Sequence, residues 1–198
     1  MVRGSIDEAV AVLLAGGIVA YPTDTLYGLA VDPRRDDAVE RLFGVKGREL
    51  TCAIPLIAGS VAQAGEAAQL GDGELRLARQ FWPGPLSIVA PARAGISRLV
   101  LAGGRTVAVR VPAHPVAAEL ALAFGFCITA TSANFSGHPG VADPKLVARA
   151  LADRIDCLID GGPAPGGPAS TMVELREGVP VLVRAGAIAW DRVLRSIE

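Results

Sequence analysis

The chain has 198 residues, of which 51% are hydrophobic and only 5% aromatic, and its formal net charge at pH 7 is −1. This length suits one domain with a buried core, and the apolar content excludes a disordered chain. Because the net charge is close to zero, no overall basic field would attract nucleic acid non-specifically, although a local basic groove remains open.

The first half of the chain alternates helical and strand patterns. Ser5 followed by Glu8 is a capping-box pattern, which predicts a helix that ends at the glycine pair before residue 18. Residues 18–21 then have the pattern of a short buried strand. A second helix is predicted from a cap at Asp36 or Asp37 to the lysine at position 46. Further predicted elements are a strand at 54–58, helices at about 60–70 and 72–81, and a strand at 86–90.

The second half continues the alternation of strands and helices. The predicted elements are strands at 106–111, 127–131, 157–159, 171–175 and 179–183, and helices at 115–124, from 143 onward, and at 188–197. Interleaved elements are typical of the α/β class, and the closely spaced late strands favour antiparallel pairs in a mixed sheet. Residues 161–167 are rich in Gly and Pro but few, which favours a mobile loop over a site rather than a linker. We therefore expect a single domain over residues 1–198.

The three cysteines and the absence of targeting signals indicate in which cellular compartment the protein is expected. No two cysteines have a Cys-x-x-Cys spacing, so a disulfide framework and a zinc site are disfavoured. Cys127 and Cys157 stand beside apolar strand residues and are expected to be small buried hydrophobes. No segment has the pattern of a signal peptide, and no apolar run is long enough to span a bilayer. The sequence therefore predicts a cytoplasmic protein that does not enter a membrane.

Small polar and cationic residues gather at the predicted strand ends. In open α/β sheets ligands bind at such ends, which makes these segments the candidate site. The segments are residues 22–28, 46–48, 109–112, 131–137 and 170–171 together with 184–186.

Three cations in these segments have two interpretations each. Lys46 and Arg48 follow a helix, where they either stabilise its C-terminus against the dipole or clamp phosphate. Arg110 interrupts an apolar strand, so its guanidinium either faces outward at an edge or pairs with an anion such as a substrate carboxylate.

The run of small polar residues at 131–137 is either a plain turn or a phosphate-binding loop. It has neither the Walker A pattern nor a dinucleotide fingerprint. The chain has only two histidines, and it has no Gly-x-Ser-x-Gly elbow and no His-Glu-x-x-His motif, so covalent Ser/His catalysis and zinc hydrolysis are disfavoured. His114, before Pro115, is expected to serve helix entry. What remains is a site that binds anions and positions reactants, as adenylyl transfer requires.

Taken together, these segments resemble the YrdC/TsaC family of threonylcarbamoyl-AMP synthases, in its short, single-domain form. The resemblance implies a YrdC-like α/β fold, a twisted mixed sheet flanked by helices with a concave basic groove. It also implies a nucleotidyltransferase that forms threonylcarbamoyl-AMP and pyrophosphate from L-threonine, bicarbonate and ATP, with magnesium on the phosphates and no covalent nucleophile. The matching blocks are Pro22 to Leu29, Lys46 to Arg48, Trp82 to Pro85, Val107 to Pro112, Ser132 to Gly137, Ser170 to Val173, and Arg184 with Gly186.

Residue roles also follow from the resemblance. Thr25, Arg110 and Ser170 would hold threonine, with Arg110 on its carboxylate. The residues that would hold ATP are Lys46, Arg48, Ser132, Asn134 and Arg184.

Partners and alternative functions follow as well. The product would pass to proteins that transfer the threonylcarbamoyl group to an adenosine of tRNA, and direct contact with tRNA is left open. Two alternatives remain: a YrdC-like paralogue with another acceptor and carbamoyl-AMP-type chemistry, or a double-stranded RNA-binding module without enzymatic activity.

Overall fold

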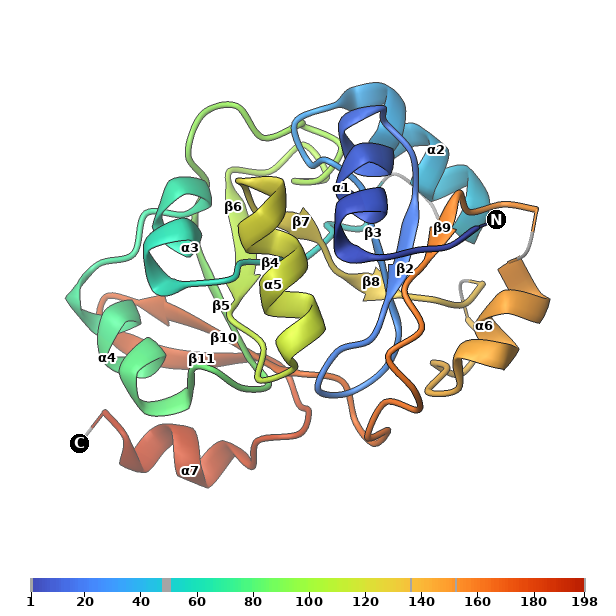
Figure 1. Cartoon of the computed structure of the whole chain (residues 1–198). Coiled ribbons are helices and arrows are strands. Elements are labelled where there is room, and N and C mark those ends of the chain that lie inside the picture. Colours follow the sequence, from blue (N-terminus) through green and yellow to red (C-terminus); the bar gives the residue numbers. More distant parts are fainter. Residues whose placement is uncertain (1, 48–50, 136, 152, 198) are drawn as a thin grey trace.

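The computed structural model describes residues 2–47, 51–135, 137–151 and 153–197, and in it the strands form two sheets (Figure 1). Both sheets combine parallel and antiparallel pairs, so the predicted mixed α/β class is confirmed, while the strands divide between two sheets instead of one. The first sheet has the order β1 (Val2–Arg3), β9 (Cys157–Leu158), β2 (Val19–Tyr21), β3 (Gly28–Ala30), β8 (Thr131–Ser132). The second has the order β11 (Val179–Arg184), β10 (Thr171–Arg176), β5 (Leu86–Pro91), β6 (Thr106–Arg110), β4 (Leu56–Ile57), β7 (Ile128–Thr129).

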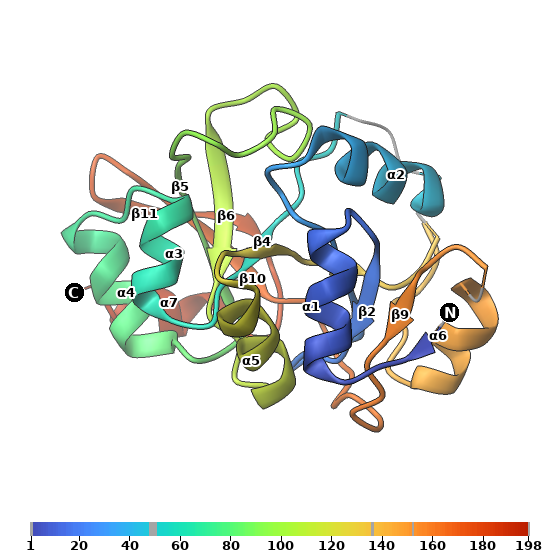
Figure 2. The ribbon, with the colours of Figure 1, turned by 45° about the horizontal axis from the view of Figure 1, so that its top comes forward.

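The helices cover these sheets, and α1 and α5 lie side by side in both views (Figures 1 and 2). They bury Leu13 and Leu120 against β2, β4 and β7. The helices of the described chain are α1 (Ile6–Leu14), α2 (Asp36–Lys46), α3 (Val61–Ala67), α4 (Asp72–Phe81), α5 (Pro115–Phe124), α6 (Pro144–Leu151) and α7 (Trp190–Arg195).

Helix caps show one confirmed and one wrong prediction. In α1 the Glu8 amide donates to Ser5 Oγ at 3.3 Å and the Ser5 amide donates to Glu8 Oε2 at 2.7 Å, which completes the capping box. The cap predicted for α2 at Asp36 or Asp37 is wrong, because Arg35 is the N-cap residue, with an extended backbone. Both aspartates lie in the first turn instead, where their charge is favourable to the helix dipole.

Strand β2 is buried on both faces, as the high apolar and low aromatic content predicted. Successive strand residues point to opposite faces, and Ala20 belongs to the larger apolar cluster with the second sheet. Val19 and Tyr21 belong to the cluster under α1 and α5. Strand β2 is thus buried between two apolar clusters.

Residues 128–132 join the two sheets. Thr129 belongs to β7, and two residues later Thr131 begins β8 in the other sheet. The buried Thr129 Oγ1 accepts from the Val31 amide at 2.9 Å and donates to the Leu29 carbonyl at 3.2 Å. The single strand predicted at 127–131 is therefore two short strands, because the chain crosses from one sheet to the other there.

The prediction that Cys127 and Cys157 are small buried hydrophobes is confirmed. Cys127 is 0% exposed and Cys157 1% exposed, and burial raises the pKa of the Cys127 thiol to about 12. A thiol with so high a pKa is a poor nucleophile at neutral pH. Within the described residues, no helix combines the length and the apolar character that crossing a membrane requires.

Candidate functional site

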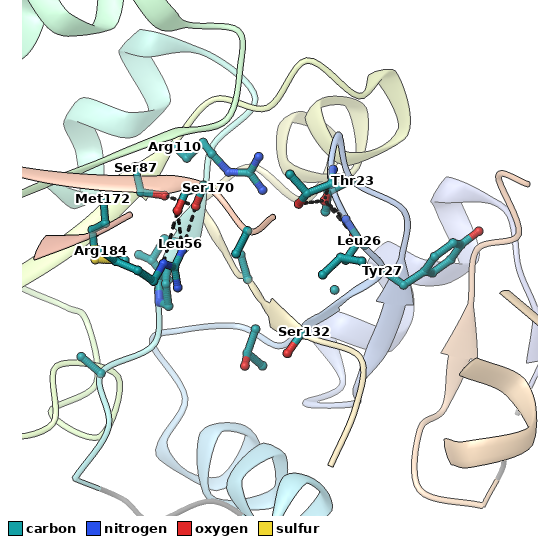
Figure 3. Close-up of a pocket in the computed structure, with 17 residues that line it drawn as sticks. Thr23, Leu26, Tyr27, Leu56, Ser87, Arg110, Ser132, Ser170, Met172 and Arg184 are labelled. Atoms are coloured by element: carbon teal, nitrogen blue, oxygen red, sulfur yellow. Dashed lines mark hydrogen bonds between the residues drawn. The ribbon is translucent and has the colours of Figure 1, made fainter. Parts of the chain in front are cut away.

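A cavity of about 220 Å³ opens where the two sheets meet, and both sheets contribute to its wall (Figure 3). The β2–β3 connection and β8 supply one side, and β4, β5, β6, β10 and β11 supply the other. The lining residues are Thr23, Thr25, Leu26, Tyr27, Gly28, Ala53, Pro55, Leu56, Ser87, Arg110, Ala130, Thr131, Ser132, Ala169, Ser170, Met172 and Arg184.

Most of the site residues predicted from the sequence meet at this cavity. Lys46 and Asn134 do not line it but are hydrogen-bonded to each other beside it. Arg48 lies outside the described residues. The predicted residues that line the cavity are Thr25, Arg110, Ser132, Ser170 and Arg184.

Ser170 is the centre of a hydrogen-bonded cluster at one end of the cavity (Figure 3). Its hydroxyl is 2.9 Å from the Ser87 hydroxyl. Arg184 Nη2 donates to the Ser170 carbonyl at 2.9 Å and to the hydroxyl at 3.0 Å. Ser87, which is 1% exposed, was missed by the sequence analysis, although a hydroxyl inside the otherwise apolar strand 86–90 was the available signal.

The backbone of Gly186 packs against the backbone that carries Ser170. A Cβ at Gly186 would lie 2.5 Å from Ser170 C and Thr171 N, and closer still to the Ala169 carbonyl oxygen. We expect Gly186→Ala to lower the free energy of unfolding by about 3 kcal/mol, measured by urea denaturation, because backbone cannot move aside as a flexible side chain can. Gly65→Ala is the control, since a Cβ there meets nothing within 4 Å and a helix favours alanine. Equal midpoints for the two variants would contradict the prediction.

Arg110 is 6% exposed and stands at the end of β6, so the outward-facing interpretation is wrong. Its Nη1 donates to the Asp24 carboxylate, and the other carboxylate oxygen accepts from the Ala113 amide at 3.3 Å. In Figure 3 the guanidinium points across the cavity toward the segment of Thr23 and Leu26. Asp24 was not predicted as the partner of Arg110, although it is the single acid of the block at 22–28.

A hydroxyl-centred turn presents Thr25 to the cavity. Thr23 Oγ1 donates to the Leu26 carbonyl at 2.7 Å and accepts from the amides of Thr25 at 3.2 Å and Leu26 at 3.3 Å. The two threonine hydroxyls are 3.2 Å apart. Such side-chain bonds hold a turn without secondary structure. Thr25 therefore has a defined orientation toward the cavity.

The Gly-rich loop at 161–167 is tied to the same segment. Tyr27 Oη donates to the Gly162 carbonyl at 2.8 Å and accepts from the Gly161 amide at 3.2 Å. The Gly166 amide donates to the Thr25 carbonyl at 2.7 Å. The loop thus lies against residues that line the cavity, while its place over the site and its mobility stay predictions.

Burial raises the pKa of Tyr27 to about 12, whereas a tyrosine in an unfolded chain titrates near 10. The unfolded state therefore loses this proton first, and the stability contributed by Tyr27 is present below about pH 10 and is lost as the pH rises toward 12. We expect Tyr27→Phe to lower the urea midpoint at pH 8 and to lower it less at pH 11. A difference from the wild type that does not change with pH would contradict this.

Lys46 is 4% exposed at the last residue of α2. Its Nζ donates to the carbonyls of Ser132 and Asn134, at 2.8 Å for the latter, and to Asn134 Oδ1 at 3.2 Å. Asn134 Oδ1 also accepts from Ser132 Oγ, and Asn134 Nδ2 donates to the His138 carbonyl. Lys46 is therefore more than a cation at a helix end, because it holds the backbone of the loop that follows β8.

His114 is the N-cap residue of α5, which confirms its predicted place at helix entry. Its Nδ1 is buried without a hydrogen-bond partner among the described residues. Burial lowers the pKa of this imidazole, and the negative charge of Asp24 opposes that shift. A neutral imidazole is the expected form at pH 7.

The side chains of the cavity do not make a metal site by themselves. In the described ranges no group of three or more His, Cys, Asp or Glu side chains could hold an ion. Among the described residues, the lining has hydroxyls and two guanidinium groups but no carboxylate. Magnesium prefers carboxylate and phosphate oxygens, so it fits here only as an ion that arrives with a phosphate ligand.

Comparison with known proteins identifies relatives of this chain. It is 36% identical over 202 residues to the threonylcarbamoyl-AMP synthase of Pyrococcus abyssi. This alignment covers 99% of the chain and 59% of the relative. It is 35% identical to the Bacillus subtilis synthase, over 95% of the chain and 55% of the relative. The chain therefore spans less than two thirds of the length of these two relatives.

Solved structures show the same likeness. P. abyssi Sua5 complexed with L-threonine has a TM-score of 0.92 and covers 99% of this chain and 59% of that one. Escherichia coli YciO has a TM-score of 0.84 at 26% identity, over 93% of this chain and 90% of that one. The model of the family Sua5/YciO/YrdC, described as telomere recombination, matches residues 11–186. The chain belongs to the Sua5/YciO/YrdC family.

Proposed function

We propose that this chain carries threonylcarbamoyl-AMP synthase activity, joining L-threonine, bicarbonate and ATP with release of pyrophosphate. The observation that carries the proposal is the cavity that brings Thr25, Arg110 and Ser170 together with Ser132 and Arg184. Support comes from the relative crystallised with L-threonine, which is 36% identical over 99% of this chain. The product would serve modification of an adenosine in tRNA.

The threonine end of the proposed site is built on Arg110. The Arg110 guanidinium is buried, and its Nη1 donates to Asp24. We propose that its other N–H groups donate to the substrate carboxylate. Thr25 and Ser170 place hydroxyls on two sides of the cavity, where they can bind the polar groups of threonine. The α-ammonium group of the bound threonine loses a proton to water, the resulting neutral amine forms a bond to the carbon of bicarbonate, and the hydroxyl group of bicarbonate leaves as water with a second proton of the amine, which gives a carbamate.

The nucleotide end would use the cations and the loop after β8. Arg184 and Ser132 line the cavity. Asn134 belongs to the loop after β8, and Lys46 donates a hydrogen bond to its carbonyl. Arg48 is proposed here from the family pattern alone. A carbamate oxygen attacks the α-phosphorus of ATP, the bond to the β-phosphate oxygen breaks, and pyrophosphate leaves. The protein aligns the reactants and stabilises charge, and magnesium would enter with the ATP phosphates.

The remaining features of the proposal follow from this reaction. One domain over residues 1–198 is supported by the family model, which matches 11–186. A concave basic groove is supported by the two arginines of the cavity wall. Cytoplasmic location and transfer of the product by partner proteins to tRNA are the setting in which such a product is used.

The test is pyrophosphate release from ATP with magnesium and bicarbonate, with and without L-threonine. Threonine-dependent release with a threonylcarbamoyl-AMP peak in mass spectrometry is the expected result. Release that ignores threonine would favour a paralogue with another acceptor. Absence of release from folded protein, together with salt-sensitive binding of double-stranded RNA, would favour the binding module.

A further inference from the structure

We propose that Asp24 makes the cavity select a zwitterionic amino acid over a plain carboxylate. The inference rests on the proposed function and adds a specificity-determining residue to it. It starts from the ion pair between Asp24 and Arg110, of which Arg110 lines the cavity where the two sheets meet.

The ion pair between Arg110 and Asp24 is almost completely buried. The side chains of Arg110 and Asp24 are 7% and 11% exposed, so solvent screens their charges only weakly. Arg110 lines the cavity and Asp24 does not, and the Ala113 amide holds the second carboxylate oxygen at 3.3 Å. Asp24 thus acts by the charge that it places beside Arg110.

This charge decides which ligands Arg110 accepts. The pair is neutral, so a carboxylate without a cation brings one uncompensated negative charge into a buried site, which is unfavourable. An amino acid brings its own ammonium group and leaves the net charge unchanged. The dipole of the zwitterion is complementary to that of the pair, with carboxylate toward Arg110 and ammonium toward the negative side.

Among the described residues, Arg184 and His114 also bear on this charge balance. Arg184, the second cation of the lining, is hydrogen-bonded to Ser170, and the phosphates of ATP take up its charge in the proposed site. His114 lies within electrostatic reach of Asp24, and its burial favours the neutral imidazole. With ATP bound, the selectivity at Arg110 therefore depends on Asp24.

The experiment compares L-threonine with (R)-3-hydroxybutyrate, which is threonine without its α-amino group. Threonine-dependent pyrophosphate release is measured at saturating magnesium–ATP with the hydroxy acid as competitor, and the inhibition constant is divided by the KM for threonine. The wild type is expected to give a ratio of about 100 or more, and Asp24→Asn to lower it at least about tenfold, since one charge is removed. Asp24→Glu keeps the charge and is expected to keep the ratio.

Asp32→Asn is the matched control, because Asp32 is 5% exposed and pairs with Arg34 at 2.8 Å without lining the cavity. It is expected to leave the ratio unchanged. A role of Asp24 that is only structural would raise KM and the inhibition constant together and leave the ratio as it is, which would overturn the inference. If the wild type gives a ratio of inhibition constant to KM near 1, the inference is overturned without any variant being needed. Pyrophosphate release that does not depend on threonine in the wild type would instead refute the proposed function beneath it.

Discussion

Arg110→Ala is expected to lower kcat/KM for L-threonine at least about a hundredfold, since truncating one partner of a buried charge pair costs about 2–5 kcal/mol. The variant loses the cation of the cavity that is nearest the Thr23–Leu26 turn, and it leaves the Asp24 carboxylate buried beside the place where the substrate carboxylate would bind. Steady-state pyrophosphate release at varied threonine concentrations is the measurement. The loss is expected in KM and kcat together, because a carboxylate that is not held also misplaces the amine.

Two further variants separate binding from folding. Arg110→Lys keeps the charge but not the planar fork, so its loss should be intermediate. Arg110→Ala also leaves Asp24 without its counter-charge, which is destabilising in a buried site. Arg110→Ala combined with Asp24→Ala is expected to recover stability and not activity. Full threonine-dependent turnover by folded Arg110→Ala would refute the assignment of Arg110.

Lys46→Ala is expected to lower the free energy of unfolding by about 3 kcal/mol, as an unsatisfied buried polar group costs about 1–3 kcal/mol and three acceptors lose their donor. These acceptors are the carbonyls of Ser132 and Asn134 and the side-chain oxygen of Asn134. Because the same loop lines the proposed phosphate site, the KM for ATP should rise about tenfold or more. Urea denaturation and ATP titration of pyrophosphate release measure the two effects.

Lys145→Ala provides the control for Lys46→Ala, because Lys145 is the other lysine of the chain and is exposed on α6. It is expected to change neither the urea midpoint nor the KM for ATP. If Lys46→Ala behaves in the same way, the lysine does not organise the loop after β8, and the assignment of Ser132 and Asn134 to the phosphates loses its structural support.

Local signals predicted much of the fold. Helix α5 has the predicted bounds, since Pro115 fits its first turn and Gly125 follows with a φ of 79°, a left-handed value that ends helices. The capping box of Ser5 predicted the start of α1. The antiparallel pairing of β10 and β11 followed from the two residues between them. In each case the decisive residues are neighbours along the chain.

The features that the sequence did not predict depend on distant residues or on very short elements. Strands β1 and β3 have two and three residues, too few for an alternating pattern to be visible. The division into two sheets depends on pairings between segments far apart in the chain. Asp24 and Arg110 are 86 positions apart, and Ser87 and Ser170 are 83 apart. Residue type and position alone pointed to Lys46, Arg48 and Arg110, and the roles of the eight candidate residues followed from the family resemblance. Their hydrogen-bonded partners became visible only in the structure.

The position of the cavity where the two sheets meet has a consequence for the synthesis of the protein on the ribosome. Its wall begins with Thr23 and ends with Arg184, so residues from both ends of the described chain are needed to complete it. A chain that emerges from the ribosome N-terminus first exposes Thr25 well before Ser170 and Arg184 are synthesised. A nascent chain therefore cannot complete the cavity for the two proposed ligands until Arg184 has left the exit tunnel.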